Sequence, residues 1–301
     1  MQIGVWIDEG RPLPEVLDAV DEVGRSGVAR VWISQRFGWD ALSVLAAARG
    51  RGGGVQLGTS IALLFPKHPV AFAQEALTAS AATGGRLTIG VGPGPQQVVE
   101  GAFGLTWERP ARRLREYLEV LGPLLRGEKV DVRGEWVSAA AELVAPDAPV
   151  PPVLVSALGP VMLQVAGELA EGTITAWAGP KALDEFIVPR LVAAAGAVGR
   201  PSPQVVAGVC VVVTGDEDGA RRRVAEMFGR VADLPSYRAV LDRSGYAGAA
   251  DAVVAGDEAT VARELRRYVD AGATEVQVAM IGTTEENART LALLADLAAR
   301  G

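Results

Sequence analysis

Short apolar runs rich in valine and isoleucine alternate with longer stretches of helical periodicity along the whole chain. We predict strands at residues 3–7, 30–34, 55–61, 86–92, 152–157, 173–177, 205–213 and 275–281. Helical patterns lie between them, for example at 14–27, 69–85, 109–127, 160–172 and 259–272. The strand segments are nearly continuous in apolar residues, as parallel strands covered on both faces require.

This alternation indicates the fold class. Eight strand–helix units in a chain of 301 residues, with no linker, favour an α/β fold of the closed (β/α)₈ TIM-barrel type over an open doubly wound sheet. We therefore predict a single domain over residues 1–301. Two insertions break the pattern: one at about 128–150, expected to form a small hairpin before the fifth strand, and a mostly helical one at about 216–256 after the seventh. Such insertions usually shape or cover a barrel's mouth.

Composition and charge limit the partners. The net charge is −7, and the one basic cluster is Arg221 to Arg223, which we expect on a solvated helix face. The chain therefore lacks the basic surface that binding to a nucleic acid requires. No apolar stretch approaches a membrane span and the first residues contain no targeting pattern. We expect a cytoplasmic protein without a membrane partner, acting on a small molecule. Apolar helix faces permit a homodimer.

The chain contains one cysteine and one histidine. Cys210 allows no internal disulfide and His68 allows no histidine-rich metal site, so we expect no metal. His68 precedes Pro69 at an apparent helix start, where a capping or packing role is favoured over catalysis. Cys210 lies within an apolar strand, which favours a buried, inert thiol.

The stretch GGRLTIGVGPGP at 84–95 resembles a dinucleotide-binding turn but fails its fingerprint. G-x-G-x-x-G requires a third glycine where Pro95 stands, and Pro93 and Pro95 lack the N–H groups that hold a pyrophosphate. We interpret the segment instead as a strand opening into a glycine-rich loop.

A barrel's active site lies at the carboxyl ends of its strands, and here those ends are polar but poor in acids and bases. Asp8, Glu9 and Arg36 carry the charge, and no carboxylate pair suited to glycoside chemistry is evident. A bound cofactor is therefore expected to carry the reaction. The best anion site is residues 157–159 before a helix that starts at Pro160, although the residues alone equally allow an ordinary helix start.

The chain resembles, over essentially its whole length, the luciferase-like flavin and deazaflavin oxidoreductases, and within them the coenzyme F420-dependent branch. The likeness is carried, in order, by LGTSI, HPVAFAQEALTASAATGGRLTIGVGPG, VVEGAFGL, RPARRLREYLEVL, PPVLVSALGPVMLQVAGELAEGTITAW, LPSYRAVLDRSG and GDEATV. Each piece alone is weak, but a chance match in this shared order is improbable.

The resemblance implies a barrel with F420 in its mouth and a cofactor-binding set drawn from several strand ends. Thr59, Ser60 and Ile61 would form a third-strand bulge behind the deazaflavin, with a cis peptide expected between Ser60 and Ile61. Backbone donors at 157–159 would hold the phosphate. The full expected set is Ser34, Gln35, Thr59, Ser60, Ile61, Gly92, Ala157, Leu158, Gly159 and Trp177.

The sequence also departs from the family. Its sugar-phosphate dehydrogenases use a histidine and a glutamate where this chain has Arg36 and Pro95, so sugar phosphate is not carried over as the substrate. Asp8 and Arg36 are our candidates for substrate contact or for a proton donor. The alternative for each is a role at the surface or in a salt bridge.

The expected reaction is hydride transfer between C5 of F420 and a small organic substrate. The deazaflavin has carbon where flavin has N5, which disfavours one-electron chemistry with oxygen, so hydride transfer fits better than monooxygenation. Two alternatives stay open: an FMN-dependent luciferase-like monooxygenase, and a non-catalytic deazaflavin-binding protein.

Overall fold

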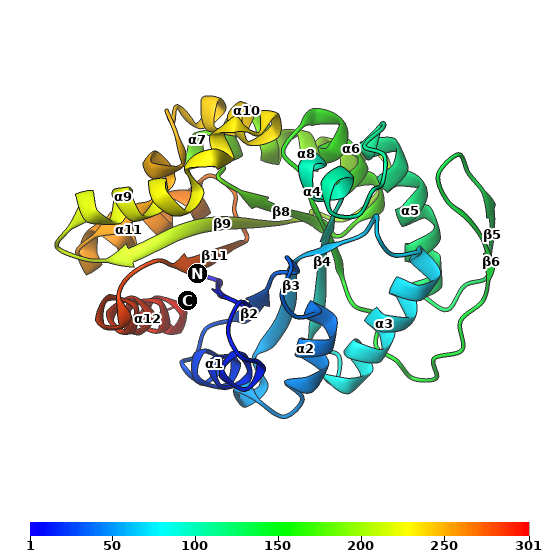
Figure 1. Ribbon diagram of the computed structural model, residues 1–301, viewed down its shortest axis with the longest axis horizontal. Coiled ribbons are helices and arrows are strands. Elements are labelled where there is room, and N and C mark those ends of the chain that lie inside the picture. The colour runs from blue at the N-terminus through cyan, green and yellow to red at the C-terminus, as the bar shows by residue number, and fades with distance from the viewer. Residues whose placement is uncertain (301) are drawn as a thin grey trace.

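The computed structural model describes residues 1–300, and within this range eight parallel strands close into a barrel (Figure 1). The strand order is β9-β11-β1-β2-β3-β4-β7-β8, and a β8–β9 pairing closes the ring. The strands are β1 (Ile3–Ile7), β2 (Arg30–Ile33), β3 (Gln56–Leu63), β4 (Leu87–Gly92), β7 (Val153–Ser156), β8 (Gly172–Ala176), β9 (Gln204–Val213) and β11 (Glu275–Met280). The predicted TIM barrel and all its strands are confirmed; residue 301, the last of the predicted domain, lies outside the described residues.

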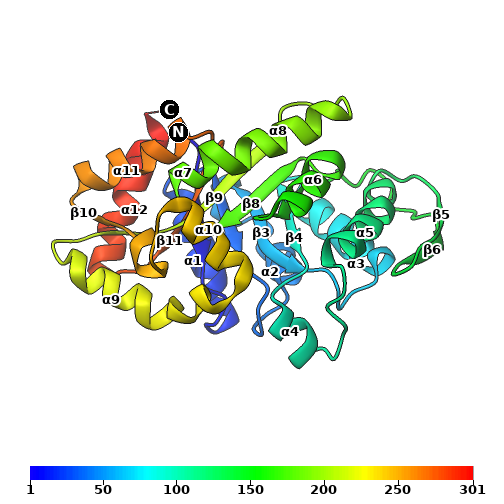
Figure 2. The same ribbon diagram turned by 90° about the horizontal axis from the view of Figure 1, so that it is seen from above.

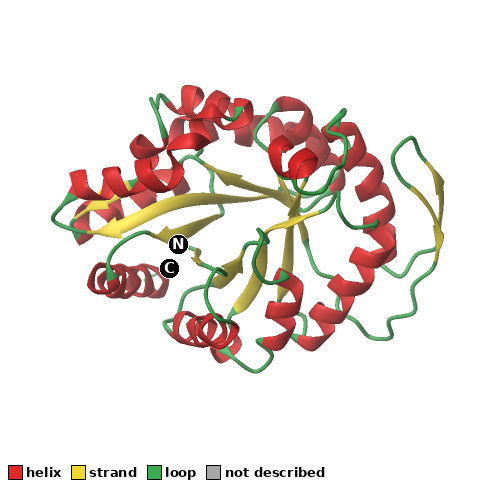
Figure 3. Ribbon diagram, in the orientation of Figure 1, coloured by secondary structure: helices red, strands yellow, loops and turns green. Residues whose placement is uncertain are grey.

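Helices surround the strands, with the main apolar core packed between the two layers (Figure 3). The outer helices are α1 (Leu13–Arg25), α2 (Ala41–Ala47), α3 (Pro69–Ala82), α5 (Pro110–Leu125), α6 (Pro160–Leu169), α8 (Val188–Ala197), α11 (Glu258–Asp270) and α12 (Thr284–Ala299). Shorter or connecting segments are η1 (Gly52–Gly54), α4 (Gln96–Gly101), α7 (Pro180–Ala182) and η2 (Leu183–Ile187). None of the helices formed by residues 1–300 is long and apolar enough to cross a bilayer.

Local capping sets where several helices begin. His68 is the N-cap of α3, where its Nδ1 accepts a hydrogen bond from the Val70 N–H at 3.3 Å, so the predicted capping role is confirmed. At the start of α12, Thr283 and Glu286 form a reciprocal capping box. These side chains satisfy amide groups that a helix start leaves free.

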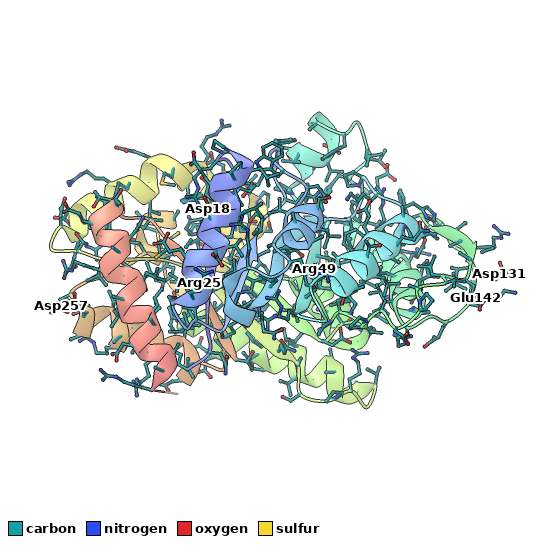
Figure 4. All side chains as sticks on the ribbon, turned by 90° about the horizontal axis from the view of Figure 1, so that it is seen from below. Asp18, Arg25, Arg49, Asp131, Glu142 and Asp257 are labelled. Carbon is teal, nitrogen blue, oxygen red and sulfur yellow. The ribbon has the colours of Figure 1, made fainter. Side chains whose placement is uncertain are left out.

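The first insertion forms the predicted hairpin, in which β5 (Val130–Arg133) pairs antiparallel with β6 (Ser138–Ala141). It lies outside the helical layer, beyond α3 and α5, so the expectation that it would cover the mouth was wrong (Figure 1). The Glu116 carboxylate on α5 accepts the N–H groups of Trp136 and Val137, which ties the hairpin turn to that helix. Asp131 and Glu142 lie at its outer edge (Figure 4).

The second insertion contains α9 (Glu217–Phe228), η3 (Gly229–Asp233), α10 (Pro235–Ser244) and η4 (Ala249–Ala252). The break at Pro235 is confirmed, and a left-handed Gly245 follows α10. A short strand that we did not predict, β10 (Val254–Gly256), pairs with the far end of β9. α9 and α4 share the edge of the molecule to which the strands' carboxyl ends point (Figure 2). This insertion therefore reaches the mouth.

Arg221 and Arg222 on α9 are exposed, as predicted, and pair with acidic neighbours on the same segment. Arg223 is less exposed and pairs with Glu286 of α12 at 3.1 Å. The basic cluster is thus neutralised on a solvated helix face.

Trp32 packs inside the barrel with Leu154, Ile174 and Val206 from other strands. Its side chain is fully buried, and glycines face it: a Cβ on Gly4 or Gly58 would lie 2.4 Å from its ring. Its indole N–H donates to Glu275 Oε1 at 2.7 Å, and Arg30 Nε lies 3.4 Å from the other oxygen. Burial nevertheless raises the pKa of Glu275, because lost hydration outweighs the opposing effects of Arg30 and Trp32.

Candidate active site

A cavity of about 220 Å³ opens at the carboxyl ends of the strands. Its walls come from β1, β3, β8, β9 and β11, from the segments that follow β2 and β8, from the second insertion and from α11. The lining residues are Trp6, Ser34, Arg36, Ser60, Thr175, Ala176, Trp177, Ala178, Gly208, Val209, Cys210, Phe228, Ala252, Tyr268, Gln277 and Ala279. This is the position at which barrels of this class carry their active sites.

A hydrogen-bonded chain of side chains crosses four neighbouring strands at one wall of this cavity. The Trp6 indole N–H donates to Ser34 Oγ at 2.6 Å, and the Ser34 hydroxyl donates to the Ser60 carbonyl at 2.5 Å. The Ser60 hydroxyl donates in turn to Gln277 Oε1 at 3.0 Å. These bonds hold β1, β2, β3 and β11 in register at the mouth and fix the orientation of the polar groups there.

The third strand carries the predicted bulge. The peptide between Ser60 and Ile61 is cis, as expected, and the pairing with β4 shifts between Thr59 and Ala62. A Cβ on Gly92 would lie 2.6 Å from Ile61 Cδ1 and 3.1 Å from Ser156 Cβ. The bulge, the end of β4 and the end of β7 therefore meet at one point, where the missing side chain of Gly92 leaves room for Ile61.

Gln35 lies beside this junction. Its N–H donates to the Ile61 carbonyl at 3.1 Å, so the end of β2 is joined to the bulge. Its side-chain Oε1 is buried and finds no hydrogen-bond partner among residues 1–300. A buried carbonyl oxygen without a partner costs roughly 1–3 kcal/mol, so a donor supplied by a ligand would be favourable here.

Residues 157–159 join the end of β7 to α6. Ala157 and Leu158 are buried, and α6 starts without a capping side chain from any described residue. Nothing in residues 1–300 would lie within 4 Å of a Cβ placed on Gly159, so open space faces this turn. An uncapped helix start beside open space suits an anion.

Arg36 forms an ion-paired cluster with both acidic residues that follow β1. Its Nε lies 2.6 Å from Glu9 Oε1, its Nη2 pairs with Asp8 Oδ1, and its guanidinium lies 5.3 Å from the centre of the Trp6 ring. The hydrogen bond to Glu9 is the main reason why the pKa of Arg36 is raised. The cluster therefore presents a permanently charged guanidinium at the cavity wall.

The structure brings the predicted site residues together only in part. Ser34, Arg36, Ser60 and Trp177 line the cavity, while Gln35, Ile61, Gly92 and residues 157–159 surround the adjoining bulge and the start of α6. Asp8 is exposed at the rim. Thr59 is fully buried and its hydroxyl donates to the Gly90 carbonyl at 2.8 Å, so its side chain braces the bulge from behind.

Several lining residues escaped the sequence analysis. Trp6 and Gln277 point inward from within their strands, a pattern that strand alternation could have revealed. Phe228 and Ala252 come from an insertion whose course the sequence does not indicate. Cys210 is buried, as predicted, and burial raises the pKa of its thiol to about 12.

Comparisons with known proteins place this chain in a family. Residues 1–300 match the model of the luciferase-like monooxygenase family. The chain is 27% identical over 260 residues to the 5,10-methylenetetrahydromethanopterin reductase of Methanolobus tindarius, covering 85% of this chain and 78% of that protein. It is 26% identical over 277 residues to a putative coenzyme F420-dependent oxidoreductase of Mycobacterium tuberculosis, covering 84% of this chain and 79% of the relative.

Solved structures agree on the fold. The coenzyme F420-dependent tetrahydromethanopterin reductase of Methanopyrus kandleri superimposes with a TM-score of 0.82 at 24% identity, over 98% of this chain and 97% of that one. An F420-dependent secondary alcohol dehydrogenase in complex with an F420–acetone adduct gives 0.84 at 19% identity, with the same coverage. With its barrel, its bulge and a family match over residues 1–300, the chain belongs to the luciferase-like monooxygenase family.

Proposed function

We propose that this protein is a coenzyme F420-dependent oxidoreductase that transfers a hydride between C5 of the deazaflavin and a small organic substrate. The observation that carries the proposal is the junction of Ile61, Gly92 and the end of β7, beside the Gln35 Oε1 that has no hydrogen-bond partner within the described chain. The relative named as a putative coenzyme F420-dependent oxidoreductase supports the choice of cofactor.

The residues present fit this group. Ser60, Ile61 and Gly92 would lie against the ring, with Ser34 beside them, and Gln35 Oε1 would accept a hydrogen bond from the bound cofactor. The backbone of residues 157–159 and the dipole of α6 would hold the phosphate. Bound F420 supplies a carbon hydride donor or acceptor at C5, which the side chains themselves cannot provide.

The protein's own contribution is positioning and electrostatics. The Trp6–Ser34–Ser60–Gln277 chain would keep one wall rigid, so that ring and substrate meet in a reactive orientation. Arg36 remains protonated, so it would bind a polar group of the substrate or cofactor and would not donate a proton. Asp8, exposed at the rim and paired with Arg36, would tune that contact.

A luciferase-like monooxygenase that uses FMN is the second candidate. The family's own description names monooxygenases. The oxygenating component of the 3,6-diketocamphane monooxygenase from Pseudomonas putida, solved in complex with FMN, shares the fold with a TM-score of 0.77 at 17% identity.

Titration calorimetry with F420 and with FMN separates the two candidates. We expect saturable 1:1 binding of F420. Gln35→Ala should weaken this binding about tenfold or more, because the variant loses the hydrogen bond that Gln35 Oε1 would accept from the cofactor, and a loss of about 1.4 kcal/mol corresponds to a tenfold change in affinity. Gln74→Ala, on the exposed face of α3, is the matched control and is expected to bind F420 like the wild type. Tight FMN binding without F420 binding would overturn the proposal.

A second assay tests for catalysis. We expect bound reduced F420 to be oxidised by at least one member of a panel of small carbonyl compounds and activated alkenes. F420 binding without oxidation across the panel would favour the non-catalytic deazaflavin-binding protein.

A further inference from the structure

The cavity has two walls of different chemistry. The wall built by β11, β1, β2 and β3 is polar and carries the hydrogen-bonded chain of Trp6, Ser34, Ser60 and Gln277. The opposite wall, which we call the apolar wall, comes from β8, β9 and the second insertion. Its apolar side chains are Trp177, Ala178, Val209, Cys210, Phe228 and Ala252, and the hydroxyl-bearing Thr175 and Tyr268 line the same side.

The apolar wall belongs to a packed aromatic and aliphatic cluster. The rings of Trp177 and Phe228 lie 5.1 Å apart at 59°. Both rings pack against a cluster that contains Cys210 and buried side chains of α9 and β10. Such a surface recognises apolar groups by removing them from water.

The loop after β8 holds Trp177 in place. Trp177 has φ of 64°, a left-handed conformation that a bulky side chain adopts only where its surroundings enforce it. The next turn is fastened to the second insertion, since the Gly179 N–H donates to Ser244 Oγ at 2.8 Å. A Cβ on Gly179 would lie 2.6 Å from the Tyr246 hydroxyl, so the two segments pack closely. The insertion thus orients the aromatic side of the cavity.

Charge is confined to the polar wall. Arg36 is the one charged side chain that lines the cavity within residues 1–300, and Asp8 and Glu9 already neutralise it. Tyr268 and Cys210, the ionisable groups on the other side, both have pKa values raised by burial, to about 12 for Cys210. An anionic group placed against the apolar wall would lose its hydration without gaining a partner, which is strongly unfavourable.

Resting on the proposed function, we propose that the apolar wall is the substrate-recognition surface and selects an uncharged, mainly apolar compound with a reducible C=C or C=O bond. Anionic compounds such as carboxylates and phosphate esters are excluded. Trp177, which the resemblance grouped with the cofactor, then contacts the substrate. The cavity of about 220 Å³ would also have to hold the part of the deazaflavin that lies against Ser34 and Ser60, so the space left at the apolar wall favours a small compound.

The test compares two probes that differ by one charge: cyclohex-2-en-1-one and 3-oxocyclohex-1-ene-1-carboxylate. Binding of each is measured by ligand-observed NMR, with and without F420. We expect the wild type to bind the enone at least tenfold more tightly than its carboxylate analogue. Equal or tighter binding of the carboxylate would overturn the proposal.

A pair of neighbouring variants locates the effect. Phe228→Arg places a cation on the apolar wall, so enone binding should fall about tenfold or more and the preference over the carboxylate should shrink. Met227→Arg adds the same charge at an adjacent position of α9 that is 61% exposed, and should change neither. Ala252→Val narrows the cavity beside the same wall, so it should also weaken enone binding. This variant tests the proposal if Phe228→Arg fails to fold.

The F420 titration on the same preparations separates the two proposals. If the protein binds F420 but variants at Phe228 and Ala252 leave its affinity for the enone unchanged, the proposed role of the apolar wall is overturned and the proposed function is not. Enone binding that depends on these residues, in a protein that binds no F420, would overturn the proposed function and retain the apolar wall.

Discussion

Arg36 and Glu9 form a two-point ion pair at the mouth of the barrel. Nε of Arg36 lies 2.6 Å from Oε1 of Glu9 and Nη2 lies 3.1 Å from Oε2. Glu9 is 2% exposed, whereas Asp8, which binds the same guanidinium, is half exposed. The two carboxylates therefore differ in how much water competes for the arginine.

We expect Glu9→Ala to destabilise the fold by about 1.5–3 kcal/mol, the usual range for a hydrogen bond to a charged group in a shielded position. Asp8→Ala should cost less than about 1 kcal/mol, as exposed ion pairs do. Urea unfolding measures both. Equal losses for the two variants would mean that burial does not distinguish the two contacts.

Gly159→Asp tests the proposed anion site without weakening the helix. Aspartate is a preferred N-cap, so α6 should be as stable as in the wild type or slightly more so. The same charge would repel a phosphate, so F420 affinity should fall at least about tenfold, a change of 1.4 kcal/mol.

Gly159→Ala is the control, because its Cβ would meet open space within the described chain. We expect its F420 affinity to match that of the wild type. Unchanged affinity in Gly159→Asp would remove residues 157–159 from the cofactor site.

Gly58→Ala should disturb the packing around Trp32 inside the barrel. The added Cβ would lie 2.4 Å from Cζ3 of Trp32, and overpacking of this kind costs about 1–3 kcal/mol. In a Trp32→Phe background the cost should shrink, because the outer ring is gone. A double-mutant cycle by chemical unfolding measures this coupling.

Gly196→Ala in α8 is the matched control, since nothing within residues 1–300 would lie within 4 Å of its Cβ. It should be neutral or stabilising. A purely additive cycle between Gly58 and Trp32 would contradict the crowding.

Glu275 should make stability depend on pH. Burial raises its folded-state pKa above the ordinary value of 4.5, so the folded protein holds this proton more tightly than the unfolded chain. Its contribution is therefore fully present below about pH 4.5 and is lost as the pH rises through the raised pKa.

Glu275→Gln removes this titration. Subtracting the unfolding free energy of the variant from that of the wild type should give a difference that falls from acidic to neutral pH. Urea unfolding between pH 4 and 8 measures it, and a difference that rises with pH would reverse the sign of the shift.

The sequence by itself determined the barrel and many of its boundaries. Valine-rich runs of nearly continuous apolar character indicate buried parallel strands, and helix starts such as His68 before Pro69 and the break at Pro235 follow from local backbone chemistry. These signals lie within a few residues of one another, so no tertiary contact is needed to recognise them. The resemblance to a family added the bulge at Ser60–Ile61.

Only the tertiary structure decided which side chains meet. Glu9 pairs with Arg36 from the neighbouring strand, and Gln35 Oε1 finds no hydrogen-bond partner within residues 1–300. Phe228 packs on Trp177 from an insertion far along the chain. The hairpin within 128–150 lies outside the helical layer, where Glu116 joins it to α5. Such contacts depend on packing between elements that are distant in sequence. Hydrophobic periodicity indicates which face of an element is buried, but it does not indicate which neighbouring element covers that face.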